Sequence, residues 1–301
     1  MNTQTKGHNS RIAGTAAVLG AGCLWGTSCL FVRGMSALGM TSTMQTAFKM
    51  FLTFLFYLIF LLCTDRSKLK IKLKDIWIFA ASGMFSMSVF TWLHYYVLIN
   101  GQVSVTTALI YTSPIFVMLM SAALFKEPVT RIKLVAVALA VLGCALTASV
   151  FSETYQTPLV ITALSILAGA AYATYSILAK YATRTYQALT MTTYTFLFAS
   201  LCTIPFGHVP EALRLMADDP RLIALCLGKN AVASAMPFFL YTWGISRIEA
   251  GRAAVFATME PLVSCALGII VLGEAANVSK ILGILLILSS VVLLSIRRSA
   301  A

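Results

Sequence analysis

Three ionisable side chains lie deep inside long apolar segments of the chain, where a charge is expensive to bury. Counted at about 1.5 Å per helical residue, Lys49, Lys229 and Glu260 each stand roughly 12–14 Å from the nearer end of their segment. A charged residue at the centre of a membrane helix costs about 2.5–3.5 kcal/mol on insertion scales, so it normally faces a cavity or a partner. The three residues therefore predict a polar centre near the midplane of a membrane bundle.

Such a centre could bind a small charged solute. One lysine would bind the carboxylate of an anionic or zwitterionic substrate, and Glu260 would bind its ammonium group or carry a coupling proton. The alternative is a structural Lys–Glu pair that holds helices together and touches no solute.

Two prolines point to the same region. Pro114 and Pro261 stand 147 positions apart in apolar segments, and each removes a backbone donor and frees a carbonyl. In lipid, freed carbonyls are tolerated where they face protein or a water-filled cavity. We therefore expect both prolines to line the central cavity, with a structural kink as the alternative.

Aromatic residues occupy a similar depth. Trp25 and Tyr172 are also 147 positions apart, and Tyr111 and Tyr175 lie well inside their segments. Rings of this kind can clamp a flat or cationic solute by stacking or by cation–π contact, although ordinary helix packing explains them equally well. We include all four among the candidate substrate contacts.

These spacings belong to a repeat that extends along the whole chain. The counterparts, 147 positions apart, include Pro114 and Pro261, Glu127 and Glu274, Lys133 and Lys280, Gly22 and Gly169, Thr43 and Thr190, Met44 and Met191, and Phe51 and Phe198. Tyr96 maps onto Trp243, and both are candidate substrate contacts. A repeat with an odd number of spans enters the membrane from opposite sides, and inverted repeats build secondary transporters with a site near the midplane.

Composition agrees with a membrane location. Hydrophobic residues make up 59% of the chain and charged residues 11%, against about 45–50% and about 25% in soluble domains. The apolar segments are about 20 residues long, which fits helices crossing a hydrocarbon core of about 30 Å. We therefore expect an all-α integral membrane protein, with membrane lipids as partners. The seven cysteines lie in apolar tracts without ligand spacing, so no metal site is expected.

The expected fold has ten transmembrane helices joined by short loops. They form two inverted five-helix repeats, residues 12–150 and 158–296, between tails at 1–11 and 297–301. The expected helices are 12–32, 40–63, 76–99, 103–125, 131–150, 158–179, 188–207, 221–246, 252–272 and 278–296.

Basic residues indicate the orientation. Sixteen Lys and Arg residues fall on the side of both termini and four on the other, and the densest run is Arg66–Lys74. Because basic residues collect in cytoplasmic loops, both termini are expected in the cytoplasm. The net charge of +12 is then explained by topology, and no nucleic-acid partner is expected.

Several segments, taken in order, resemble a known family. They are Leu24-Trp25-Gly26-Thr27-Ser28, then Ser113-Pro114 with Lys126-Glu127-Pro128, then Met259-Glu260-Pro261 with Leu272-Gly273-Glu274. Over roughly residues 12–296 the chain resembles the EamA-type members of the drug/metabolite transporter superfamily. The resemblance implies a ten-helix inverted-repeat fold, small-metabolite transport that is often amino-acid export, and a bacterial inner-membrane location. The family commonly has an Arg where Lys49 stands, and its Glu before this Pro suits a shared structural or gating role for Glu260.

We therefore expect a secondary transporter that exports amino acids or related compounds by alternating access. The alternatives are uptake, exchange of anionic or phosphorylated solutes, or a receptor or scaffold that transports nothing. The sequence contains no Ser-His-Asp spacing, no HExxH and no Gly-rich phosphate loop, so neither an enzyme nor an ATP-driven pump is expected. No cofactor is expected, and coupling would use protons, a counter-substrate or a downhill gradient.

Overall fold

The computed structural model describes residues 3–100, 109–147, 158–271 and 277–296. Every regular element in these ranges is a helix. Six helical stretches of the described residues are long and apolar enough to cross a membrane, and two shorter apolar helices accompany them. Large apolar side chains cover the outside of the bundle, as on Phe85 and Trp92, which are 72% and 67% exposed. This surface suits contact with lipid.

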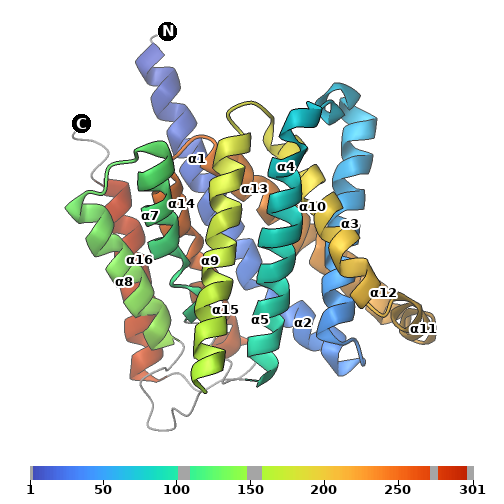
Figure 1. The fold of residues 1–301 in the computed structure, drawn as a ribbon. Coiled ribbons are helices and arrows are strands. Elements are labelled where there is room, and N and C mark those ends of the chain that lie inside the picture. The colour runs from blue at the N-terminus through green and yellow to red at the C-terminus, as the bar shows by residue number, and fades with distance from the viewer. Residues whose placement is uncertain (1–2, 101–108, 148–157, 272–276, 297–301) are drawn as a thin grey trace.

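The first half of the chain builds a bundle that Figure 1 shows in blue to green. Its elements are α1 Thr3–Gly26, α2 Ser28–Ala37, α3 Ser42–Thr64, η1 Arg66–Leu69, η2 Leu73–Asp75, α4 Ile76–Ala80, η3 Ala81–Ser88, α5 Val89–Asn100, α7 Ser113–Phe125 and α8 Arg131–Thr147.

The second half follows in yellow to red, and its helices lie among those of the first half (Figure 1). Its elements are α9 Leu159–Ala182, α10 Ala188–Thr203, η4 Ile204–Phe206, α11 Val209–Asp218, α12 Pro220–Asn230, η5 Ala231–Ala235, α13 Met236–Ile245, α14 Ala250–Ala257, α15 Met259–Ile270 and α16 Val278–Ile296. Helix α1 begins and α16 ends at the same end of the bundle.

Six of the expected spans coincide with the six long apolar stretches. The expected spans 103–125, 131–150 and 252–272 lie partly outside the described residues. In their described parts, the structure has α7, α8, α14 and α15. Helix α1 begins at Thr3, so residues 3–11 of the expected N-terminal tail are helical. The connection between the seventh and eighth expected spans is longer than the short loop expected there. It holds α11, a short helix that buries Ala212 and Met216 on one face.

Irregular helical segments recur at the 147-residue spacing. The π-helical segments η3 and η5 end at Ser88 and Ala235. Helices α7 and α15 each begin just after a break, at Tyr111 and Thr112 in one case and at Thr258 in the other. Pro114 and Pro261 follow these breaks, and each lies in the first turn of a new helix, where its missing donor is not needed.

Close backbone contacts recur in the same way. A Cβ added at Gly22 would lie 3.2 Å from the carbonyl oxygen of Ala257, and one added at Gly169 would lie 2.8 Å from that of Ile110. Positions 22 and 169 are counterparts, as are 110 and 257. The first helix of each half therefore packs directly against the break in the other half, where small residues permit a close approach.

Gly26 gives a direct test of this packing. A Cβ at Gly26 would lie 2.6 Å from Val263 Cβ and 2.9 Å from the carbonyl oxygen of Glu260. We expect Gly26→Ala to destabilise the protein by about 1–3 kcal/mol because the α1–α15 contact becomes overpacked. Gly20→Ala is the matched control, since its Cβ would meet nothing nearer than 3.9 Å. Melting in detergent measures both, and equal melting temperatures for the two variants would contradict the expectation.

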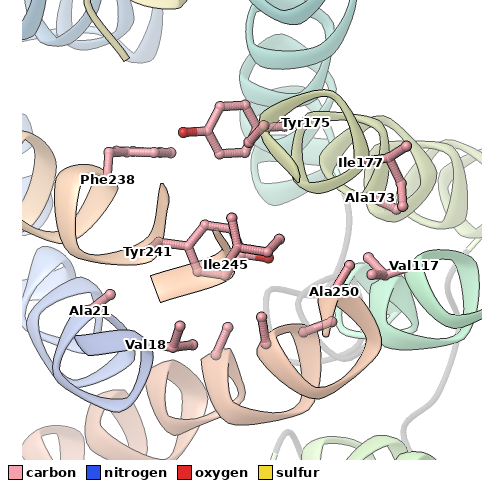
Figure 2. Packing of buried hydrophobic residues seen from close by; sticks show 14 of the residues in the cluster. Val18, Ala21, Val117, Ala173, Tyr175, Ile177, Phe238, Tyr241, Ile245 and Ala250 are labelled. Atoms are coloured by element: carbon pink, nitrogen blue, oxygen red, sulfur yellow. The ribbon is translucent and has the colours of Figure 1, made fainter. Parts of the chain in front are cut away.

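An aromatic core forms where α9 and α13 of the second half pack beside α1 of the first. Tyr175 stacks on Tyr241 at 6.3 Å between ring centroids, and Phe238 contacts Tyr175 edge to face at 5.7 Å. Figure 2 shows these rings with Val18 and Ala21 close by. The buried tyrosine hydroxyls form hydrogen bonds within the core. Tyr175 Oη lies 2.7 Å from Thr242 Oγ1, and Tyr241 Oη lies 2.6 Å from Ser176 Oγ. This rigid core supports the polar groups described next.

Candidate functional site

Lys49 and Glu260, from the two halves of the chain, lie within electrostatic range of each other. Glu260 is the second residue of α15 and accepts a hydrogen bond from the Tyr111 hydroxyl, at the break that precedes α7. Lys49, on α3, interacts electrostatically with the same carboxylate. Lys49, Tyr111 and Glu260 are half-buried, so they retain accessible surface inside the bundle. The structure therefore brings Lys49, Tyr111 and Glu260 into one region, which we call the polar centre.

Aromatic rings line this centre. Lys49 Nζ lies 5.2 Å from the centroid of the Phe238 ring, a cation–π distance. Trp25 contacts Phe238 at 5.0 Å and Tyr172 at 6.4 Å, and Phe90 contacts Tyr172 at 5.2 Å. We call Trp25, Phe90, Tyr172 and Phe238 the aromatic wall. Its rings come from α1, α5, α9 and α13, so both halves contribute to it.

Lys229 lies on α12 and joins Lys49 in one small cavity. Its side chain is buried, and Nζ donates a hydrogen bond of 3.4 Å to Gln45 Oε1. Gln45 is held in place because its Nε2 donates to Ser36 Oγ at 2.9 Å and to the Met40 carbonyl at 3.1 Å. We call this cavity the lysine pocket.

His94 belongs to the same region. Its ring lies 5.4 Å from that of Phe90, and it is within electrostatic range of both Lys49 and Lys229. The imidazole therefore extends the aromatic wall toward the two lysines.

Two expected site residues, Tyr175 and Tyr96, lie away from Lys49 and Glu260, and two others, Pro114 and Pro261, lie beside Tyr111 and Glu260. Tyr175 is fully buried in the aromatic core, where it bonds to Thr242. Tyr96 is 46% exposed, and it lies two positions after His94 in the helix, which puts it on another face of α5. Pro114 and Pro261 are buried in the first turns of α7 and α15, next to Tyr111 and Glu260.

Trp243 lines a separate hollow of about 430 Å³ at the end of the bundle that carries the α3–α4 and α9–α10 loops. Its ring is stacked by Arg247 at 3.5 Å. Residues 239, 243, 246 and 247 form one face of α13 and its end, and all four line the hollow. The basic residues Lys68 and Arg247 give this hollow a positive lining.

Several residues of the site carry no signal in a charge-based reading of the sequence. Phe90 and Phe238 are ordinary aromatic residues in apolar segments, and Ser234 is an ordinary small one. Gln45 and Asn230 are amides in such segments, and that rarity is the signal that could have found them. Within the described residues, no group of three or more His, Cys, Asp or Glu side chains could hold a metal ion.

Comparisons with known proteins identify the family of the chain. The model of the EamA-like transporter family matches residues 12–149 and matches residues 159–296 a second time. The chain belongs to the EamA-like transporter family. Its two EamA matches begin 147 positions apart, which is the spacing of the sequence repeat and of the helix breaks. The chain is thus a multi-pass membrane protein of a transporter family with a two-repeat architecture.

Relatives of this EamA protein carry similar descriptions. An uncharacterized transporter of Archaeoglobus fulgidus is 29% identical over 71% of this chain and 75% of its own length. A second one from that organism is 26% identical over 93% and 95% of the two chains. The uncharacterized transporter YwfM of Bacillus subtilis is 23% identical over 63% of each. One crystal structure shares the fold, with a TM-score of 0.76 and 16% identity over 97% of this chain and 100% of the other.

Proposed function

We propose that this EamA protein is a secondary transporter that exports amino acids or related small metabolites by alternating access. Ten transmembrane helices would form two inverted repeats, with both termini in the cytoplasm of a bacterial cell and the substrate site between the repeats. A proton, a counter-substrate or a downhill gradient would drive transport. Family membership and the repeat support this proposal.

The observation that carries the proposal is that Lys49 and Glu260, from opposite halves, lie within electrostatic range of each other. Opposite charges that retain accessible surface suit a zwitterion, whose carboxylate would bind Lys49 and whose ammonium group would bind Glu260. The aromatic wall would hold the ammonium end by cation–π contact and the apolar part of the solute by packing.

The symmetric irregularities support a mechanism of rocking repeats. Helix α1 and its counterpart α9 run through the bundle in opposite directions (Figure 1). The breaks before α7 and α15 and the π segments η3 and η5 are places where short helical pieces can reorient. Because Glu260 and Tyr111 lie at these breaks, binding of a solute to them would be coupled to helix movement.

Ligand-induced stabilisation followed by flux tests the proposal. Purified protein in detergent would be screened with amino acids, nucleosides, sugars, organic acids and polyamines, since a ligand that binds the folded state raises its apparent stability. We expect amino acids to stabilise the protein, and to leave preloaded proteoliposomes faster than they leave preloaded liposomes that lack the protein. Stabilisation only by phosphorylated or other anionic solutes would replace this function with anion exchange. A blank screen together with absent flux would overturn transport of metabolites.

A further inference from the structure

The lysine pocket is built from more polar groups than an apolar bundle needs. Polar side chains reach it from α3, from α12 and from η5, and they are Gln45, Lys49, Lys229, Asn230 and Ser234. Lys229, Asn230 and Ser234 are each at least nine-tenths buried. The cavity measures about 10 Å³, which is room for about one water-sized occupant. It can therefore admit the end of a solute, but not a whole metabolite.

One of these groups lacks a partner. Ser234 Oγ is the buried side-chain polar atom that makes no hydrogen bond within the described part of the chain. Buried hydroxyls are nearly always bonded, and a serine hydroxyl can donate as well as accept. Asn230, beside it in the pocket, is already engaged, since its Nδ2 donates to Thr53 Oγ1 at 3.3 Å. The Ser234 hydroxyl can therefore donate a hydrogen bond to an acceptor atom of a bound solute.

The charges around the pocket favour an anion. No carboxylate of the described residues lies within salt-bridge distance of Lys229, whose hydrogen-bond partner is the neutral amide of Gln45. Lys49 lines the pocket and also interacts with Glu260, so it stands between the pocket and the carboxylate. Together Lys49, Lys229 and Glu260 supply two positive charges and one negative charge. A solute with two negative charges and one positive charge would balance them.

We infer that the lysine pocket binds the side-chain carboxylate of an acidic amino acid. The inference rests on the proposed function and narrows its substrate class. The α-ammonium group lies at Glu260, the α-carboxylate at Lys49, and the second carboxylate enters the pocket, where Lys229 and the Ser234 hydroxyl donate to it. The basic hollow at the loop end, lined by Lys68 and Arg247, would attract the same anionic solutes.

The test compares L-glutamate with L-glutamine, which have the same shape but differ by the second carboxylate charge. Dissociation constants would be measured by thermal stabilisation of the purified full chain. We expect the wild type to bind glutamate at least about tenfold more tightly than glutamine, because a charged hydrogen bond is worth that much. In Lys229→Gln this ratio should fall to near one, whatever happens to the absolute affinities. In Ser234→Ala the ratio should fall severalfold.

The outcomes separate the inference from the proposed function. Equal binding of glutamate and glutamine by the wild type, or an unchanged ratio in Lys229→Gln, would overturn the acidic-substrate inference and leave an amino-acid transporter. If neither of these compounds nor any other amino acid binds, both the acidic-substrate inference and the proposed function are overturned. Tighter binding of O-phospho-L-serine than of glutamate would assign the pocket to phosphate instead. If Lys229→Gln does not fold, an unchanged ratio in Ser234→Ala alone overturns the inference. Lys74→Gln, on an exposed lysine, is the control and should keep the wild-type ratio.

Discussion

Lys49→Ala is expected to abolish transport of a carboxylate-bearing substrate while the protein still folds. A lost charged hydrogen bond is worth about 1.5–3 kcal/mol, which corresponds to a loss of about 10–100-fold in substrate affinity. Folding should survive, because Lys49 is half-buried and its removal relieves a desolvated ammonium group. Glu260 keeps its hydrogen bond from Tyr111 in the variant. Flux in proteoliposomes and melting of the purified protein measure the two effects separately.

A matched lysine makes this experiment sharp. Lys74 is exposed at the loop end of the bundle, so Lys74→Ala should leave flux and melting temperature close to wild type. If Lys49→Ala yields aggregated protein, Lys49 is a structural residue of the bundle. If it yields folded protein with wild-type flux, the polar centre does not bind the substrate carboxylate.

Glu260→Gln is expected to reduce transport at least about tenfold and to flatten its pH profile. The substitution preserves volume and can still accept a hydrogen bond from Tyr111, but it removes the only acidic group of the polar centre within the described residues. An amide neither pairs with an ammonium group by charge nor exchanges a proton, so both roles disappear together. Flux measured across a range of pH values gives both readouts.

Two further variants isolate the role of this carboxylate. Glu211→Gln changes an exposed residue of α11 and should leave the pH profile unaltered. Tyr111→Phe removes the hydrogen bond to Glu260 and keeps the carboxylate, so it should weaken flux yet preserve its pH dependence. A wild-type pH profile in Glu260→Gln would rule out Glu260 as the coupling group. Undiminished flux would also rule it out as the ammonium site.

The sequence by itself established the class of protein and its repeat. Hydropathy and the scarcity of charge are local properties, so the apolar segments 40–63, 158–179 and 188–207 could be placed close to α3, α9 and α10 without knowledge of their neighbours. The spacing of 147 residues was readable from matched prolines and glycines, and the two family matches reproduce it. Lys49 and Glu260 stood out because charges in apolar segments are rare.

Only the tertiary structure decided which of these residues meet. Whether a side chain faces a cavity, the core or lipid depends on how its helix is rotated and which helices it crosses, and those contacts join residues far apart in sequence. Thus Tyr175 lies in the aromatic core, Trp243 in the loop-end hollow and Tyr96 on an exposed face, although all three looked equivalent to Trp25. Phe238 and Ser234 joined the site for the same reason. Hydropathy fixes how deep a residue lies in a segment, whereas the packing of both halves fixes the direction in which it points.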